Sequence, residues 1–209
     1  MKALLYKDFY SLWKYSKMYL FMCGIFLAIS VFEQSQEIFG LYPLVLMGML
    51  PMTMVAYDER DNWERTALTM PFSRKQLVTE KYLFALLLMG GVFGLTALTA
   101  FLNQWLGGGF ALREYAVELS MRLLLAIVGP AFMLPPVFRF GAEKGRMAYL
   151  VTLAVIIGGG VAGALIINRM GLSQTEVNGL VIALTAAGAA LLLPVSWLLS
   201  VRFYEKREF

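Results

Sequence analysis

The sequence predicts an all-α, polytopic membrane protein that forms one domain over residues 1–209. First, 59% of the residues are hydrophobic and only 15% are charged, which is too little charge to cover a soluble protein of this size. Second, six apolar stretches of about 15 to 24 residues are long enough to cross a bilayer as helices. Third, short basic loops alternate with loops poor in Lys and Arg, which predicts a definite orientation.

The charge bias predicts which side each loop faces. If the N-terminus is cytoplasmic, only Arg113, Arg122 and Arg169 fall outside, so 15 of the 18 Lys and Arg residues are cytoplasmic. Basic residues concentrate in the cytoplasmic loops of membrane proteins. We therefore expect a multi-pass protein of the bacterial cytoplasmic membrane, with both termini in the cytoplasm.

Residues 1–17 predict an amphipathic helix that lies on the membrane surface. At about 100° per residue, one face carries apolar side chains, namely Leu5, Phe9, Leu12 and Trp13. The opposite face carries polar ones, namely Lys7, Ser11 and Lys14. This pattern is typical of interfacial helices. The alternative is that these residues extend the first span.

Six spans are expected to follow the interfacial helix, at residues 18–32, 39–57, 82–102, 119–138, 147–168 and 177–200. Three prolines fall in the fourth span: Pro130, Pro135 and Pro136. They are expected to kink it and to leave backbone carbonyls that must be satisfied inside the protein.

Between the second and third spans lies the longest polar segment, residues 58–81. Its first half is expected to be helical, with Asp58 and Glu59 near the N-terminus, where the helix dipole favours acidic side chains. Pro71 is expected to end this helix. Ser73 and Gln76 form a capping-box pattern, which predicts a second helix from about Arg74 into the third span.

This polar segment has two interpretations. It is either a solvated loop that only sets the topology, or a docking surface for a cytoplasmic partner. In the second case Trp63, Met70 and Phe72 would be apolar anchors inside a rim of charge. Large apolar side chains among charges favour docking.

At these residues the sequence resembles the permease subunits of type 2 ABC exporters, and most of all the small permeases of the phenol-soluble modulin exporter group. The topology agrees over the whole chain, but the likeness is specific only from about Tyr57 to Leu83. The residues that carry it are Tyr57, Asp58, Glu59, Trp63, Thr69, Met70, Pro71, Phe72, Ser73, Arg74, Lys75, Glu80, Lys81 and Tyr82.

The resemblance implies a dimer of permeases, with itself or a paralogue, and two separate ABC ATPase subunits that bind ATP and Mg. The segment between spans two and three would be a coupling helix that docks on an ATPase, through Asp58, Glu59, Trp63, Glu64, Thr69, Met70, Pro71, Phe72, Ser73 and Arg74. The N-terminal helix would be an interface helix, with Lys7, Asp8 and Lys14. No cofactor is expected on this chain itself.

Glu118 and Arg122 stand four residues apart near the outer end of the fourth span. Charges at mid-bilayer are costly, so we expect them to pair near the interface, as a structural pair or at a substrate exit. Two G-x-x-x-G spacings, Gly90 with Gly94 and Gly159 with Gly163, would permit close helix packing within a subunit or across a dimer.

Composition argues against several classes of function. The chain has no His and one Cys, so we expect no catalytic residues, no metal site and no enzyme activity of its own. It has no phosphate-binding loop motif, and the basic excess follows the topology rule, so no nucleic-acid partner is expected. The leading hypothesis is an exporter permease for amphipathic peptides or similar membrane-active compounds. The alternatives are an ATP-independent secondary transporter or channel, a membrane-bound enzyme, and a regulatory protein.

Overall fold

The computed structural model describes residues 2–32, 37–106, 111–170 and 174–206. These residues form nine α-helices and no strand. The helices are α1 (Lys2–Tyr15), α2 (Lys17–Phe32), α3 (Glu37–Gly48), α4 (Leu50–Arg60), α5 (Trp63–Leu68), α6 (Arg74–Leu106), α7 (Leu112–Phe140), α8 (Ala142–Met170) and α9 (Gln174–Glu205).

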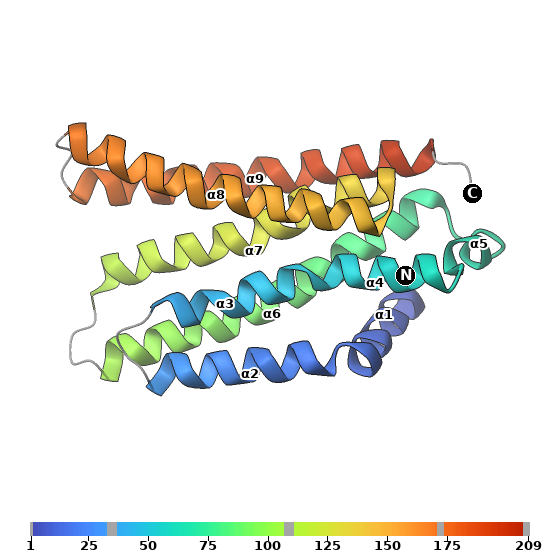
Figure 1. The fold of residues 1–209 in the computed structure, drawn as a ribbon, viewed down its shortest axis with the longest axis horizontal. Helices are drawn as coiled ribbons and strands as arrows, with labels where there is room; N and C mark the ends of the chain where they lie inside the picture. The colour runs from blue at the N-terminus through green and yellow to red at the C-terminus, as the bar shows by residue number, and fades with distance from the viewer. Residues whose placement is uncertain (1, 33–36, 107–110, 171–173, 207–209) are drawn as a thin grey trace.

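The long helices run side by side in an elongated bundle (Figure 1). α7 packs against α8 and α9, while α6 contacts α3, α7 and α9. The short α5, the junction of α7 and α8 and the C-terminal end of α9 share one end of the bundle (Figure 1). We call this the α5 end. The sequence prediction places it in the cytoplasm.

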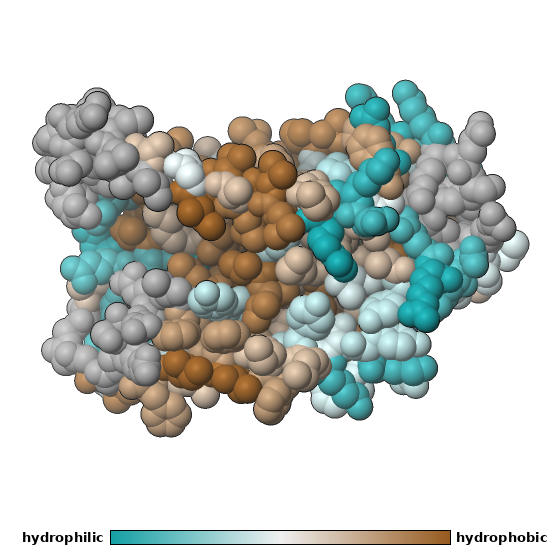
Figure 2. Space-filling view, viewed as in Figure 1, coloured by the Kyte–Doolittle hydropathy of each residue, from teal (hydrophilic) through white to brown (hydrophobic). Residues whose placement is uncertain are grey.

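Four helical segments are long and apolar enough to cross a membrane, namely Phe39–Arg60, Arg74–Leu106, Leu112–Phe140 and Val181–Glu205. The bent pair α1 and α2 adds a fifth if it counts as one span. Hydrophobic side chains gather over the middle of the bundle and hydrophilic ones at the α5 end (Figure 2). A multi-pass membrane protein is therefore confirmed, whereas the count of six spans stays a prediction.

The N-terminal helix α1 meets α2 at an angle of 75°, so it does not prolong that helix in a straight line. The side of α1 that packs on the rest of the protein includes a charged residue. Leu4, Asp8 and Leu12 are buried against the rest of the protein, whereas Phe9 and Trp13 are 40% and 65% exposed. The predicted apolar face is thus divided between Leu12, which packs on the protein, and Phe9 and Trp13, which are exposed. That this face lies in the membrane stays a prediction.

The predicted second span is divided into α3 and α4 at Met49. The Met49 amide donates to the Leu46 carbonyl at 3.3 Å, which is a tighter turn than the α-helix makes. The Val45 carbonyl, which an α-helix would pair with Met49, instead accepts the Tyr149 hydroxyl at 2.7 Å. A side chain of α8 thus compensates the break.

The fourth predicted span, α7, continues as a helix through Pro130, Pro135 and Pro136. Pro135 has no amide hydrogen to donate to the Ala131 carbonyl four residues earlier. The Ser196 hydroxyl of α9 donates to that carbonyl at 2.5 Å. The predicted need for internal satisfaction of a freed carbonyl is therefore met by a side chain of a neighbouring helix.

The polar segment 58–81 begins differently from the prediction. Asp58 and Glu59 belong to the last turn of α4 and do not start a new helix. Asn62 then takes a left-handed conformation with φ of 51°, and α5 starts at the next residue. Acidic side chains at a helix C-terminus are unfavourable for the dipole, so their partners must come from other helices.

The second half of this segment follows the prediction closely. α5 ends at Leu68, before Pro71, and α6 begins at Arg74. The Gln76 amide donates to the Ser73 hydroxyl at 3.2 Å, and the Ser73 amide donates to the Gln76 side-chain oxygen at 3.0 Å. This reciprocal pair is the capping box, which is confirmed.

Candidate functional site

Four charged side chains from α1, α4 and α6 meet near the α5 end, and we call them the charge cluster: Lys7, Asp8, Asp58 and Lys81. The Lys81 ammonium lies 2.6 Å from a carboxylate oxygen of Asp8 and 2.6 Å from one of Asp58. Lys7 lies 2.6 Å from the other oxygen of Asp58 and 3.1 Å from Asp8. Two cations and two anions therefore alternate, and each cation contacts both carboxylates.

The charge cluster is largely buried, so its charges depend on one another for compensation. The Asp8 side chain is 1% exposed and that of Lys81 is 10% exposed. Burial by itself raises the pKa of Asp8, but Lys81 and Lys7 outweigh it and hold the pKa below its ordinary value. Removing one partner of a buried pair leaves an uncompensated charge, which costs about 3–5 kcal/mol. The charge cluster therefore fixes α1 against α4 and α6.

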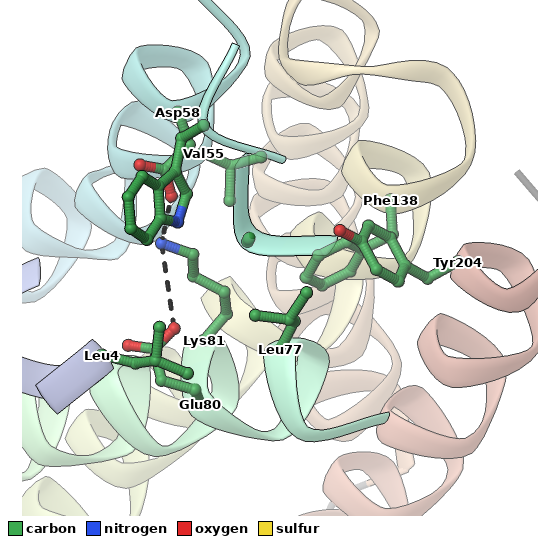
Figure 3. A pocket seen from close by; sticks show the side chains of 10 residues that line it. Leu4, Val55, Asp58, Leu77, Glu80, Lys81, Phe138 and Tyr204 are labelled. Atoms are coloured by element: carbon green, nitrogen blue, oxygen red, sulfur yellow. Dashed lines mark hydrogen bonds and ion pairs between the residues drawn. The ribbon is translucent and has the colours of Figure 1, made fainter. Parts of the chain in front are cut away.

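Glu80 adds a third buried carboxyl group beside the cluster. One of its oxygens is 3.9 Å from the Lys81 ammonium, and the other is buried with no hydrogen-bond partner among the described residues. Glu80 and Lys81 point into a small cavity of about 20 Å³, together with Asp58, Leu77 and Phe138 (Figure 3). That volume is about enough for one water molecule.

The helix α5 is joined to this cluster by an aromatic contact. The Lys7 ammonium stands 4.6 Å from the centre of the Trp63 ring, within the range of a cation–π interaction. Trp63 also lines the cavity, as does Ala67, which is 1% exposed. Hence one face of α5 packs against α1, α4 and α6.

The three predicted anchors of this segment differ in exposure. Trp63 and Phe72 are half-buried against an apolar cluster that includes Leu77 and Tyr204. Only Met70 is at the surface, 36% exposed. The expectation of three exposed apolar anchors therefore holds for Met70 alone, since the other two pack within the chain.

α6 is also tied to the C-terminal helix α9. The Tyr82 hydroxyl lies 2.5 Å from that of Ser196 and 2.8 Å from that of Ser200. At the start of α6, Arg74 donates to the Glu205 carbonyl at 2.8 Å. A cation at the C-terminus of a helix compensates its unpaired carbonyls. These contacts join α6 to α9, so a displacement of α6 would also displace α9.

Glu59 links the same segment to α8. Its carboxylate accepts the Ala142 amide hydrogen at 3.0 Å, at the first residue of α8. The preceding Gly141 has φ of +89°, a conformation that glycine adopts without strain. The Glu59 carboxylate therefore interacts favourably with the positive N-terminal end of α8, which offsets its unfavourable position at the C-terminus of α4.

The predicted pair at the other end of the bundle is confirmed. Glu118 accepts a hydrogen bond from Arg122, and the same guanidinium donates to the Thr96 carbonyl of α6. Arg122 is 1% exposed, whereas the Glu118 side chain is 19% exposed. Both line an open hollow of about 480 Å³ with Glu114 and Asn178. A structural role and an exit role both remain compatible with this position.

None of the other predicted residues belongs to the charge cluster where the structure describes its side chain. Thr69, Pro71 and Ser73 are exposed in the turn between α5 and α6. Lys14 is exposed at the end of α1, outside the charge cluster. The side chain of Glu64 lies outside the described residues.

Sequence reasoning missed Lys81 and Glu80 as site residues. A signal existed, because two adjacent charges directly precede a long apolar run, and burying them requires partners. Among the described residues, the predicted glycine spacings pack against no neighbouring helix. An added methyl group at Gly90, Gly94, Gly159 or Gly163 would meet no atom of the described residues within 4 Å.

These features define a multi-pass helical membrane protein with a helix-turn segment fixed to three other helices at one end. The family model described as ABC-2 family transporter protein matches residues 3–205. The chain therefore belongs to the ABC-2 family of transporter proteins. No curated protein and no solved structure matches it.

Proposed function

We propose that this chain is the permease of an ATP-driven exporter of amphipathic peptides or similar membrane-active compounds, of the phenol-soluble modulin exporter group. Membership of the ABC-2 family supports a transmembrane subunit of an ABC transporter. In this proposal two ATPase subunits bind ATP and Mg, and a second permease completes the path. The protein resides in the bacterial cytoplasmic membrane with both termini inside.

Segment 61–73 is the proposed ATPase docking element, and its attachment to the bundle is the observation that carries the proposal. Its inner face is fixed by Trp63 on Lys7 and by Ala67 in the apolar cluster. Its outer surface presents Thr69, Met70 and Pro71. A partner that pushes on this outer surface would therefore move a body that is already joined to α1, α4 and α6.

The charge cluster supports this role because it joins α1, α4 and α6 by short ionic contacts. Lys81 lies in the first third of α6, which continues from there toward the far end of the bundle. Its ammonium lies 2.6 Å from a carboxylate oxygen of Asp8 and 2.6 Å from one of Asp58. A displacement of α5 would reach this cluster through the contact of Trp63 with Lys7. In this proposal the cluster turns ATPase closure into motion of the spans.

The test is co-purification of the tagged full-length chain from its native membranes in mild detergent. We expect a stoichiometric ABC ATPase, which Met70→Asp reduces by roughly tenfold, because a charge would enter an apolar docking contact. Leu112→Asp, an exposed apolar position at the far end of the bundle, is the matched control and should keep the ATPase.

Two results would refute the proposal. A monodisperse oligomer that never retains an ATPase would favour a channel or secondary transporter. Equal ATPase recovery and equal transport in Met70→Asp and the wild type would remove segment 61–73 from the docking surface.

A further inference from the structure

Three basic side chains surround a hollow between α7 and α9 at the α5 end, separate from the charge cluster. The hollow has a volume of about 510 Å³, and Arg139, Leu199, Arg202, Phe203 and Lys206 line it. Among the described residues, its lining thus combines three cations with two apolar side chains and includes no acidic side chain.

The cations of this hollow carry charge that the described part of the chain does not neutralise. None of the three takes part in an ion pair or a side-chain hydrogen bond among the described residues. Arg139 instead lies against aromatic rings, with its guanidinium carbon 4.8 Å from the centre of Phe140 and 5.0 Å from that of Phe203. These contacts orient Arg139 but leave its hydrogen-bond donors available.

The apolar surface of α9 leads directly to this hollow. Leu191, Val195 and Leu198 are 66%, 52% and 51% exposed, and their spacing places them on one face of the helix. Arg202 follows Leu198 by four residues and Lys206 follows by another four, so the same face turns from apolar to basic. A ligand that fits must have an apolar part along α9 and an anionic part at its end.

We propose that this hollow binds the headgroup of an anionic phospholipid, with the acyl chains along α9. Charge complementarity and position both favour that occupant, because α7 and α9 are two of the segments able to cross a membrane. Basic pockets between membrane helices at the cytoplasmic side recognise phosphate headgroups. Arg202 and Lys206 bind the phosphate, and Arg139 closes the hollow from α7. This inference does not depend on the cargo or on an ATPase.

The experiment measures lipid retention by native mass spectrometry on the full-length protein, purified in neutral detergent and supplied with phosphatidylglycerol or phosphatidylcholine. The wild type is expected to retain phosphatidylglycerol selectively. The triple variant R139Q/R202Q/K206Q is expected to lose at least roughly tenfold of that retention, since each basic side chain near a lipid surface contributes about fivefold.

A control variant, K2Q/K17Q/R146Q, removes the same number of exposed charges outside the hollow. It is expected to retain phosphatidylglycerol as the wild type does. Equal retention in the triple variant, or an equal loss in the control, would overturn the site. Inorganic phosphate that abolishes phosphatidylglycerol retention would overturn it in favour of a soluble phosphate ligand.

If the triple variant does not fold, the single substitution Lys206→Gln keeps the question open to test, because this residue is exposed at the end of the described chain. Its retention of phosphatidylglycerol is expected to fall about fivefold. Retention equal to that of the wild type in this variant would overturn the proposal.

Discussion

The two ends of the bundle each bury an ion pair, but they build it from different parts of the chain. At the far end, Glu118 and Arg122 are one turn apart on α7. At the α5 end, Lys81 joins Asp8 and Asp58, which are 73 and 23 residues away in sequence. The first pair is local to one helix, whereas the charge cluster connects three.

This difference separates two uses of buried charge. An i, i+4 pair chiefly satisfies one helix, and here it also reaches the Thr96 carbonyl of a neighbour. A network across helices fixes their relative positions, because movement of any one of these helices breaks contacts with the other helices. The charge cluster is therefore the better candidate for transmitting motion, and the Glu118–Arg122 pair the better candidate for local structure.

The largest effect is expected from Lys81→Met, which removes the more buried of the two cations that Asp8 and Asp58 share and leaves only Lys7, 25% exposed, between them. The loss of stability should be about 3–5 kcal/mol, measured as a lower melting temperature of the purified protein in detergent. The triple variant D8N/D58N/K81M removes three of the four charges together, leaves only the partly exposed Lys7, and should recover most of it. A wild-type melting temperature for Lys81→Met would contradict the role of the cluster.

Arg122→Met should have a smaller effect, about 1–3 kcal/mol. Glu118 is 19% exposed and retains access to water once its partner is gone, although the Thr96 carbonyl loses a donor. The same melting assay compares this variant with Lys81→Met. The contrast between the two ends would be lost if Arg122→Met were the more damaging.

Acidic pH should weaken the α5 end through Asp8. Its folded-state pKa is lower than the ordinary value of 3.8, so its contribution to stability is present above that pH and is lost as pH falls through the folded pKa. Melting temperatures measured from about pH 6 downward should fall more steeply for the wild type than for Asp8→Asn. Parallel curves would show that Asp8 is not stabilised by the two lysines.

The smallest effect is expected from Lys7→Gln, at most about 1 kcal/mol. The Lys7 side chain is 25% exposed, so water weakens its contacts with Asp58 and with the Trp63 ring. Melting temperature should change little, while protease sensitivity of the segment around α5 should rise. A loss as large as that of Lys81→Met would show that Lys7, not Lys81, holds the cluster together.

Local features of this protein were predictable from the sequence. The capping box at Ser73 and Gln76, the end of α5 before Pro71 and the pair of Glu118 with Arg122 all depend on residues within four positions of one another. Helical geometry alone brings such residues together. The long apolar runs likewise predict membrane helices, because backbone groups in lipid must be satisfied within the helix.

The tertiary structure decided which charges meet. No periodicity in α1 indicates that Asp8 is buried against the protein while Trp13 is exposed, because that choice depends on Lys81 lying opposite. For the same reason Glu59 turned out to complement α8, and Ser196 to satisfy the carbonyl that Pro135 leaves free. A sequence specifies its local geometry through backbone sterics and short spacings, but partners far apart in the chain are chosen only when the helices pack.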